Sequence, residues 1–143
     1  MNMNEYKMVF KEGELEEGDM KVLVERMLKY HADKGHPRKK DIFSIALRDE
    51  NDKFVGGIIV SVLWNGMEID SLWVDESLRG QNWGRKLMEA TETEGRKRGC
   101  DFAYTNTFSW QASGFYEKMG YKLFGKLEDF PKGCSLSYFR KNL

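Results

Sequence analysis

The residues whose types and spacing best suit chemistry lie in one run, V-D-E-S-L-R-G-Q-N-W-G-R-K-L-M, from Val74 to Met88. The run predicts the end of a strand, a glycine-containing turn and the first turns of a helix. Backbone N–H groups at the start of a helix have no partner inside the helix, and the helix dipole adds positive charge there. Because both features attract an anion, the run indicates a phosphate-binding site.

Two other phosphate-binding motifs fit this run less well. A P-loop requires a lysine and then a hydroxyl residue after its last glycine, but Gly84 is followed by Arg85 and Lys86 with no hydroxyl next. The dinucleotide fingerprint G-x-G-x-x-G does not occur in the sequence. We therefore interpret the run as a phosphate-binding turn, or cradle, of a different kind.

Length and composition predict one domain over residues 1–143. Of these residues, 41% are hydrophobic and 32% charged, an ordinary balance for a soluble globular protein. Lysine plus arginine equals aspartate plus glutamate, at 23 each, so the formal net charge is zero. A nucleic-acid partner is therefore not expected. A local role of that kind, through the basic runs at residues 36–40 or 96–99, remains a minor alternative.

The sequence also bears on location and metal content. The N-terminus has no apolar signal core, and the longest apolar-rich run, Phe54 to Trp64, is too short to span a bilayer. Cys100 and Cys134 do not suggest a disulfide framework and lack the spacing of metal ligands, and the two histidines, His31 and His36, are too few for a metal site. We expect a cytoplasmic protein with no membrane segment and no metal.

Residue patterns predict the elements that precede the cradle. Polar and apolar residues alternate from Glu5 to Phe10, which indicates a first strand. Asp19 is expected to cap a helix from Met20 to about Asp33, which Gly35 and Pro37 would end.

Three strands are then expected in a meander, at residues Ile42–Leu47, Phe54–Leu63 and Met67–Val74. The pair Gly56-Gly57 implies a bulge or a close backbone approach. The dipeptide Asn65-Gly66 predicts a type I′ turn, so the strands on either side of it should be antiparallel neighbours.

The helix that begins in the cradle is expected to reach about Arg98, with Gly99 at its C-terminal end. A strand at Asp101–Thr107 follows, and its place after a long helix implies parallel pairing with the strand before that helix. Ser109 is expected to cap a helix from Trp110 to Met119.

Two closing strands, Tyr121–Gly125 and Ser135–Lys141, complete the pattern. The predicted fold class is α/β, in the form of an α+β mixed sheet that is mostly antiparallel, contains one parallel pair and is flanked by helices.

Two motifs carry a family resemblance. Arg79, Asn82 and Gly84 form the pattern Q/R-x-x-G-x-G/A at a strand–helix junction, with asparagine in place of the first glycine. The second pattern, A-x-x-F-Y-x-K-x-G-F/Y, is formed by Ala112, Phe115, Tyr116, Lys118, Gly120 and Tyr121. Together these motifs resemble the GNAT superfamily of acyl-CoA-dependent N-acetyltransferases, over roughly residues 54–143. Asparagine tolerates the left-handed conformation that glycine would adopt, at a cost on the order of 1 kcal/mol.

The resemblance implies acetyl-CoA as the cosubstrate, with its pyrophosphate on backbone N–H groups from Gly80 to Arg85. It also implies a splayed strand pair, in which the strand ending at Val74 parts from Asp101–Thr107 and offers its backbone to the pantetheine arm. Ser109 stands where many members have an asparagine near the cofactor. The expected cofactor-binding residues are Leu72, Trp73, Val74, Arg79, Gly80, Gln81, Asn82, Trp83, Gly84, Arg85, Lys86 and Ser109.

Acetyl transfer to an amine needs a base, because an alkylamine with a pKa of about 10 is mostly protonated at neutral pH. Glu68 and Asp70 are both candidates, since period-2 geometry places them on one face of the strand that ends at Val74, and Asp70 is expected to be the more buried. The resemblance implies that Tyr116 is the general acid near the cofactor sulfur. The aromatic residues Trp64, Trp73, Phe108 and Trp110 are candidates for an acceptor pocket, with core packing expected for most of them.

The expected function is therefore N-acetyl transfer by direct attack in a ternary complex. The alternative is a CoA-binding sensor or interaction module without turnover, which the departures at Asn82 and Ser109 favour. The acceptor stays open between a small-molecule amine and a protein amine. The final strands are candidates for pairing across a homodimer.

Overall fold

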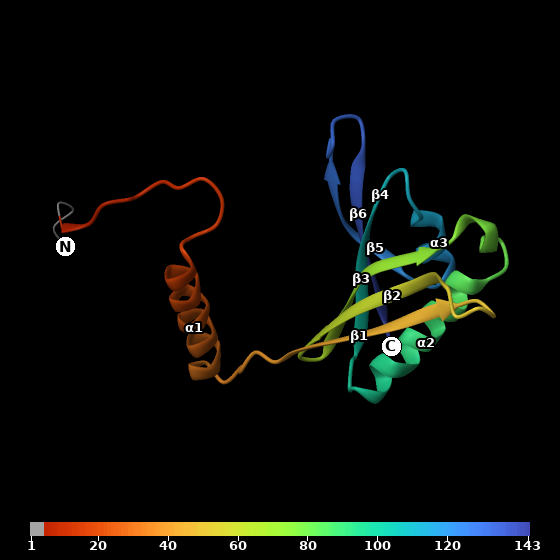
Figure 1. Cartoon of the computed structure of the whole chain (residues 1–143), viewed down its shortest axis with the longest axis horizontal. Helices are drawn as coiled ribbons and strands as arrows, with labels where there is room; N and C mark the ends of the chain where they lie inside the picture. Colours follow the sequence, from red (N-terminus) through yellow and green to blue (C-terminus); the bar gives the residue numbers. More distant parts are fainter. Residues whose placement is uncertain (1–4) are drawn as a thin grey trace. The chain divides into compact units, whose positions relative to one another are not determined.

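A computed structural model describes residues 5–143 of the protein. The chain divides into two compact units, Met1–Arg38 and Lys39–Leu143, and each is described by itself. Figure 1 shows the elements in chain order.

The first unit contains helix α1, Glu17–Asp33, whose N-cap is Glu16. The helix begins three residues earlier than expected, so the prediction that Asp19 caps it is wrong. Asp19 instead lies in the first turn, where a carboxylate is favoured by the helix dipole. Gly35 follows the helix with φ of 86° and ends it as predicted. No residue of α1 is buried.

The strand predicted at Glu5–Phe10 is also wrong. Glu5 is in a 3-10 turn, and the backbone from Tyr6 to Phe10 has no regular structure. Alternation of polar and apolar residues predicts a strand only where a neighbouring strand supplies the hydrogen bonds, and among the described residues this segment is part of no ladder. The side chains of Tyr6, Met8 and Phe10 are exposed.

The second unit is built on a six-stranded sheet with the order β1-β2-β3-β4-β6-β5. Every neighbouring pair is antiparallel except β3 and β4, which confirms the predicted mixed sheet. In Figure 1 the β5–β6 hairpin (blue) projects from the end of the sheet. The strands are β1 (Lys40–Arg48), β2 (Phe54–Leu63), β3 (Gly66–Val74), β4 (Phe102–Phe108), β5 (Lys122–Glu128) and β6 (Ser135–Asn142).

The parallel pair is made by a crossover through helix α2, Trp83–Lys97, which ends before Gly99 as predicted. Strands β3 and β4 are in register at only three residue pairs, the last of which joins Glu68 to Tyr104. One residue further, the Thr105 side chain donates a hydrogen bond to the carbonyl of Ile69 at 3.0 Å. From there the strands separate, as the family resemblance implied.

The turn between β2 and β3 differs from the prediction by one residue. Leu63 pairs with Gly66, so the two turn residues are Trp64 and Asn65, and Trp64 takes φ of 52°. Gly66 therefore belongs to the strand. Its missing side chain serves a different purpose, because a Cβ there would lie 2.5 Å from the ring of Phe102.

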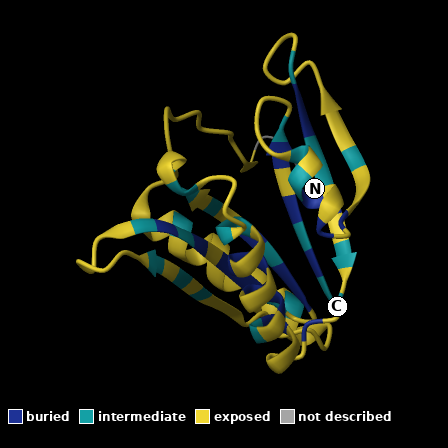
Figure 2. Ribbon diagram, turned by 90° about the vertical axis from the view of Figure 1, so that its right-hand side faces the viewer, coloured by how far each residue is buried: buried dark blue, intermediate teal, exposed yellow. Residues whose placement is uncertain are grey.

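The core lies between the sheet and α2. Met67 and Met88 are among its fully buried side chains, and Gly95 lets the helix approach β3, since a Cβ at Gly95 would lie 2.5 Å from the sulfur of Met67. Figure 2 shows buried positions running along the middle of the sheet. The same helix carries the predicted phosphate cradle at its N-terminus, so core packing sets the position of the cradle.

The helix predicted at Trp110–Met119 is shorter than expected. Helix α3 spans Ser113–Lys118, with Ala112 as its N-cap. Ser109 does not cap it, because the Ser109 hydroxyl accepts a hydrogen bond from the backbone N–H of Ser135 at 3.2 Å and so extends the link between β4 and β6.

A buried ion pair connects α2 to the last strand. Lys141 donates to both carboxylate oxygens of Glu92, at 2.9 and 3.1 Å, and Tyr121 donates its hydroxyl proton to the same carboxylate at 3.1 Å. The side chain of Glu92 is only 4% exposed. Burial, followed by the nearby Glu92 carboxylate, raises the pKa of Tyr121, which therefore stays a donor.

Replacing Lys141 with methionine should lower the free energy of unfolding by about 2–3 kcal/mol, because the buried Glu92 carboxylate loses its nearer cation and keeps Arg96 at 3.9 Å. Urea denaturation measures this change. The exposed pair of Lys126 and Glu128 is the matched control, and Lys126→Met should cost less than about 1 kcal/mol. Equal losses in the two variants would show that the Glu92 pair is no more important than a surface pair.

Candidate active site

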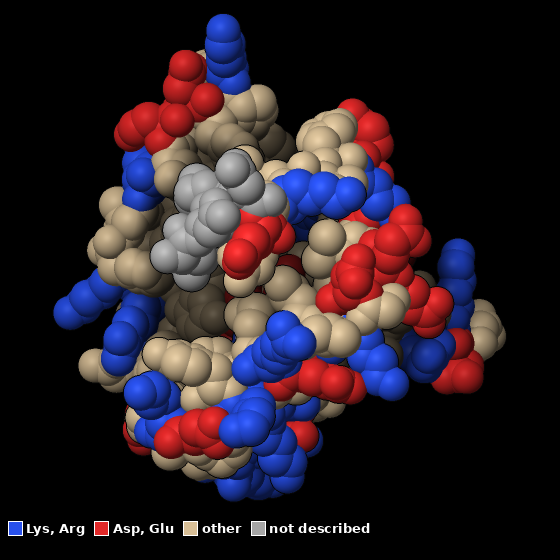
Figure 3. Space-filling view, turned by 90° about the vertical axis from the view of Figure 1, so that its left-hand side faces the viewer, with Lys and Arg blue, Asp and Glu red and all other residues tan. Residues whose placement is uncertain are grey.

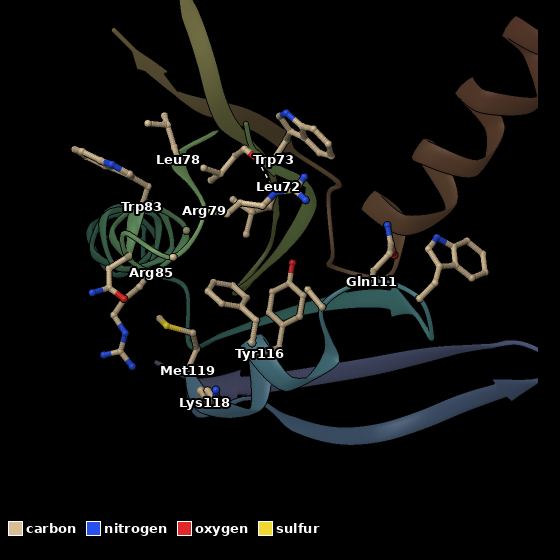
Figure 4. Close-up of a pocket in the computed structure, with 17 residues that line it drawn as sticks. Leu72, Trp73, Leu78, Arg79, Trp83, Arg85, Gln111, Tyr116, Lys118 and Met119 are labelled. Carbon is tan, nitrogen blue, oxygen red and sulfur yellow. Dashed lines mark hydrogen bonds between the residues drawn. The ribbon is translucent and has the colours of Figure 1, made fainter. Parts of the chain in front are cut away.

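A cleft of about 980 Å³ lies in the second unit, between the end of β3, the start of α2 and helix α3. It passes the point where β3 and β4 have separated. Figure 4 shows the residues that line it. They are Leu72, Trp73, Val74, Leu78, Arg79, Gly80, Asn82, Trp83, Gly84, Arg85, Trp110, Gln111, Ala112, Phe115, Tyr116, Lys118 and Met119.

The turn before α2 has the geometry of an anion cradle. Gly80 and Asn82 both adopt the left-handed region, with φ of 79° and 65°. The first bond of the helix runs from the N–H of Lys86 to the carbonyl of Asn82, which leaves the N–H groups of Trp83 to Arg85 for a ligand. Asn82 therefore takes the conformation for which the family pattern has glycine, as predicted.

The basic side chains around the cradle are partly held by other groups. Arg79 donates its Nε–H to the carbonyl of Val74 at 3.2 Å, and its guanidinium lies 4.9 Å from the centre of the Trp73 ring. Arg85 lies 3.8 Å from Glu89, in an exposed pair. Lys86 and Gln81 are not among the residues that line the cleft. Arg79 and Arg85 are thus the two basic residues of the predicted cradle that line it.

Residues 72–74 of β3 form one wall of the cleft. Leu72 pairs with Ile58 of β2 on one side, while the register with β4 has ended at Glu68. Beyond Glu68 the backbone of β3 has no strand partner on the β4 side, and two of its carbonyls are bonded by side chains, Ile69 by Thr105 and Val74 by Arg79. An extended ligand could add hydrogen bonds there as a further strand would.

Tyr116 lies on the opposite wall, on α3. Its side chain is 6% exposed and packs against the rings of Tyr121 and Phe139. Figure 4 shows its hydroxyl pointing from α3 toward the β3 side of the cleft. Burial raises the pKa of the phenol, and a hydrogen bond with Thr105 opposes part of that rise. The group therefore carries its proton at neutral pH and can act as an acid.

Glu68 and Asp70 share a face of the sheet, as predicted. Ser61, which pairs with Glu68, donates its hydroxyl proton to Asp70 at 2.5 Å, and Tyr104 donates to Glu68 at 3.1 Å. Burial and then the Glu68 carboxylate raise the pKa of Tyr104, which keeps it a donor. Neither acid lines the cleft, so their link to its chemistry stays a prediction.

The expectation that Asp70 is the more buried acid is wrong. Asp70 is exposed, whereas Glu68 is half-buried. The cause is a β-bulge, because Ile59 pairs with Ser71 while Val60 pairs with Ile69, which leaves Asp70 as the extra residue.

The cleft contains residues that sequence reasoning did not assign to it. Ala112, Phe115 and Lys118 belong to the second motif, whose spacing signalled them. Leu78, Gln111 and Met119 carried no such signal. Trp110, which was predicted as a candidate for an acceptor pocket, also lines the cleft. Gln111 braces the start of α3, because its side-chain oxygen accepts a hydrogen bond from the N–H of Phe108 at 2.8 Å. The predicted cofactor residue Ser109 does not line the cleft, and its hydroxyl contacts Ser135.

Figure 3 shows one face on which acidic and basic side chains alternate without a large patch of either sign. Within residues 5–143, no group of three or more histidine, cysteine or acidic side chains is placed to hold a metal ion. In the same part of the chain, no helix is long and apolar enough to cross a membrane.

Comparison with known proteins agrees with the fold. Residues 8–121 match the profile of the Acetyltransferase (GNAT) family. The chain is 31% identical over 107 residues to the Blasticidin-S acetyltransferase of Streptomyces morookaense, an alignment that covers 74% of this chain and 79% of that protein. The chain therefore belongs to the GNAT family and is an acetyltransferase.

Solved structures show the same fold. A crystal structure of an acetyltransferase from Bacillus cereus has a TM-score of 0.87 at 28% identity, with 99% of this chain and 100% of that chain covered. An aminoglycoside 6'-N-acetyltransferase complexed with coenzyme A has a TM-score of 0.64 at 23% identity, with 71% of this chain and 72% of that chain covered.

Replacing Asn82 with alanine should lower the free energy of unfolding by about 1 kcal/mol, because alanine tolerates a φ of 65° less well than asparagine does. Asn82→Gly should change it by less than about 0.5 kcal/mol. Urea denaturation of both variants tests this, with Gln81→Ala as the neighbouring control. If the two alanine variants lose the same stability, the left-handed conformation is not the cause.

Replacing Thr105 with valine should cost about 1–3 kcal/mol, because the buried carbonyl of Ile69 loses its donor and Tyr116 loses a hydrogen-bond partner. Thr93 makes the same kind of bond, to the carbonyl of Glu89 at 2.9 Å, but is exposed, so Thr93→Val should cost less than about 0.5 kcal/mol. Thermal unfolding compares the two. A Thr105→Val protein as stable as the Thr93 variant would contradict the assigned contact.

Proposed function

We propose that the protein transfers an acetyl group from acetyl-CoA to a primary amine, by direct attack within a ternary complex. The observation that carries the proposal is one continuous cleft that contains an anion cradle at one wall, open strand backbone at another and a buried protonated phenol facing both. The proposal goes beyond the family assignment in naming the cosubstrate, the order of events and the residues.

The residues present fit acetyl-CoA. The N–H groups at the start of α2, together with Arg79 and Arg85, would hold the pyrophosphate. The free edge of β3 at Leu72 to Val74 would hold the amide-bearing pantetheine arm. Acetyl-CoA would supply the acetyl group as a thioester.

The roles of the other residues follow from charge. A backbone N–H of β3 near Leu72 would stabilise negative charge that develops on the carbonyl oxygen. Tyr116 would give its proton to the departing sulfur. Glu68 or Asp70 would accept the proton of the amine, directly or through water. The other predicted cofactor-binding residues, Gln81, Lys86 and Ser109, do not line the cleft and would have at most a minor part in cofactor binding.

The acceptor is proposed as an amine of a small molecule, with a protein amine as the alternative. Blasticidin-S acetyltransferase and aminoglycoside 6'-N-acetyltransferase, both similar to this chain, are named for small molecules.

The same proposal includes one acetyltransferase domain over residues 1–143, since the family profile spans parts of both units. It also includes a cytoplasmic location and no nucleic-acid partner. A homodimer through the edge strand β5 remains part of the proposal.

The direct test is release of free CoA thiol from acetyl-CoA in the presence of a panel of primary amines and lysine peptides. Turnover with at least one amine, and a product whose mass has increased by one acetyl group, is the expected result. Tight CoA binding by calorimetry without acetylation of any acceptor would instead favour a binding module.

Tyr116→Phe should lower kcat by about 10²-fold or more and leave the KM for acetyl-CoA nearly unchanged, because only the proton donor is lost. Burial raises the pKa of the phenol above its ordinary value of about 10, so the protonated form persists below that pH. The wild-type rate should therefore not fall through loss of this proton below pH 10. Steady-state kinetics from pH 7 to 10 measures both effects, and an unchanged kcat would remove Tyr116 as the acid.

A further inference from the structure

Three aromatic rings form a stack beside the cleft. Phe108 at the end of β4 lies between Trp110 and Phe130. Its ring centre is 4.6 Å from that of Trp110 with planes 5° apart, and 5.9 Å from that of Phe130 with planes 19° apart. Parallel rings at these distances are a favourable arrangement, so Phe108 favours the observed orientation of the Trp110 ring.

Trp110 is the member of this stack that lines the cleft. Its side chain is 60% exposed, far more than a core tryptophan would be. One side of the ring meets Phe108, and among the described residues no other aromatic ring or cation is recorded against it. The structure therefore presents a flat apolar ring at the rim of the site, with one face stacked on Phe108.

The stack lies on the side of the sheet that carries the candidate base. Tyr104 and Phe108 are four residues apart on β4 and so share a face, and Tyr104 donates a hydrogen bond to Glu68. The same cleft has Tyr116 in its wall. A ring on Trp110 would thus belong to the acceptor side of the reaction.

We propose that Trp110 binds a planar ring carried by the acceptor, so that the substrate class is a primary amine attached to an aromatic or heteroaromatic group. This rests on the proposed function and deepens it, because it assigns a specificity-determining residue to a site whose acceptor is otherwise open. Stacking discriminates by shape. A flat ring meets the whole face of the indole, whereas a saturated ring of the same size meets only part of it.

Two other uses of Trp110 lead to different measurements. If the ring held the adenine of the cofactor, its removal would raise the KM for acetyl-CoA. If it were only packing, its removal would lower stability and affect all acceptors alike. Phe124 provides a matched control, because it is 59% exposed, contacts the ring of Tyr138 and does not line the cleft.

The test compares 2-phenylethylamine with 2-cyclohexylethylamine, which differ in the planarity of the ring. Wild-type protein should show a higher kcat/KM for the planar amine. Trp110→Ala should reduce kcat/KM for that amine about tenfold, with a much smaller change for the saturated amine and none in the KM for acetyl-CoA. Trp110→Phe should keep most of the planar preference, and Phe124→Ala should keep all of it.

Equal loss for both amines, or a raised KM for acetyl-CoA, would overturn the proposal. Trp110→Phe retains a ring on Phe108, so it gives a result even if the alanine variant does not fold. Calorimetric titration of the planar amine with CoA present separates this proposal from the proposed function. If the wild-type protein binds the planar amine and Trp110→Ala abolishes that binding, the result supports this proposal even without turnover. Turnover with no preference for the planar amine would reject this proposal and leave the transferase function standing.

Discussion

The structure depends on an interrupted parallel ladder. Strands β3 and β4 pair at three positions and then part. The place where they part is defined by Thr105, whose buried hydroxyl satisfies the Ile69 carbonyl that the ladder no longer reaches. A carbonyl left without a donor in the core would be unfavourable, so the side chain makes the opening stable. The cleft, the free edge of β3 and the position of Tyr116 all follow from that opening.

The cradle and the proposed acid depend on the same opening from opposite sides. Helix α2 is held against β3 by close approach at Gly95, and at its other end Gly84 lies next to the ring of Phe115, the residue before Tyr116. A shift of α2 would therefore move the anion site relative to the phenol. Glu92 and Lys141 resist such a shift, because their buried pair ties the middle of α2 to β6.

Much of this arrangement could be predicted from local sequence. The glycine-containing turn, the helix after it and the left-handed Asn82 depend on backbone preferences that neighbouring residues determine. The mixed sheet and the parallel pair followed from the order and length of the elements.

The exposure of Asp70 could not be predicted, because a bulge depends on how β3 registers with β2. The absence of a strand at Glu5–Phe10 and the role of Ser109 could not be predicted either. Both depend on whether a strand that is distant in the sequence lies beside these residues. Trp110 was a candidate for the acceptor pocket by its residue type, but its stack with Phe108 and Phe130 could not be predicted, because only the fold brings these rings together.

The strand order also has a consequence for synthesis of the chain. The last strand, β6, lies inside the sheet between β4 and β5. While the ribosome is still making that strand, β5 has no ladder to join, and Phe139, a fully buried neighbour of Tyr116, is absent. Domains emerge from the ribosome N-terminal part first, so α2 and Tyr116 exist before the strand that encloses them. The part of the sheet beside the cleft can therefore become ordered only after β6 has left the ribosome.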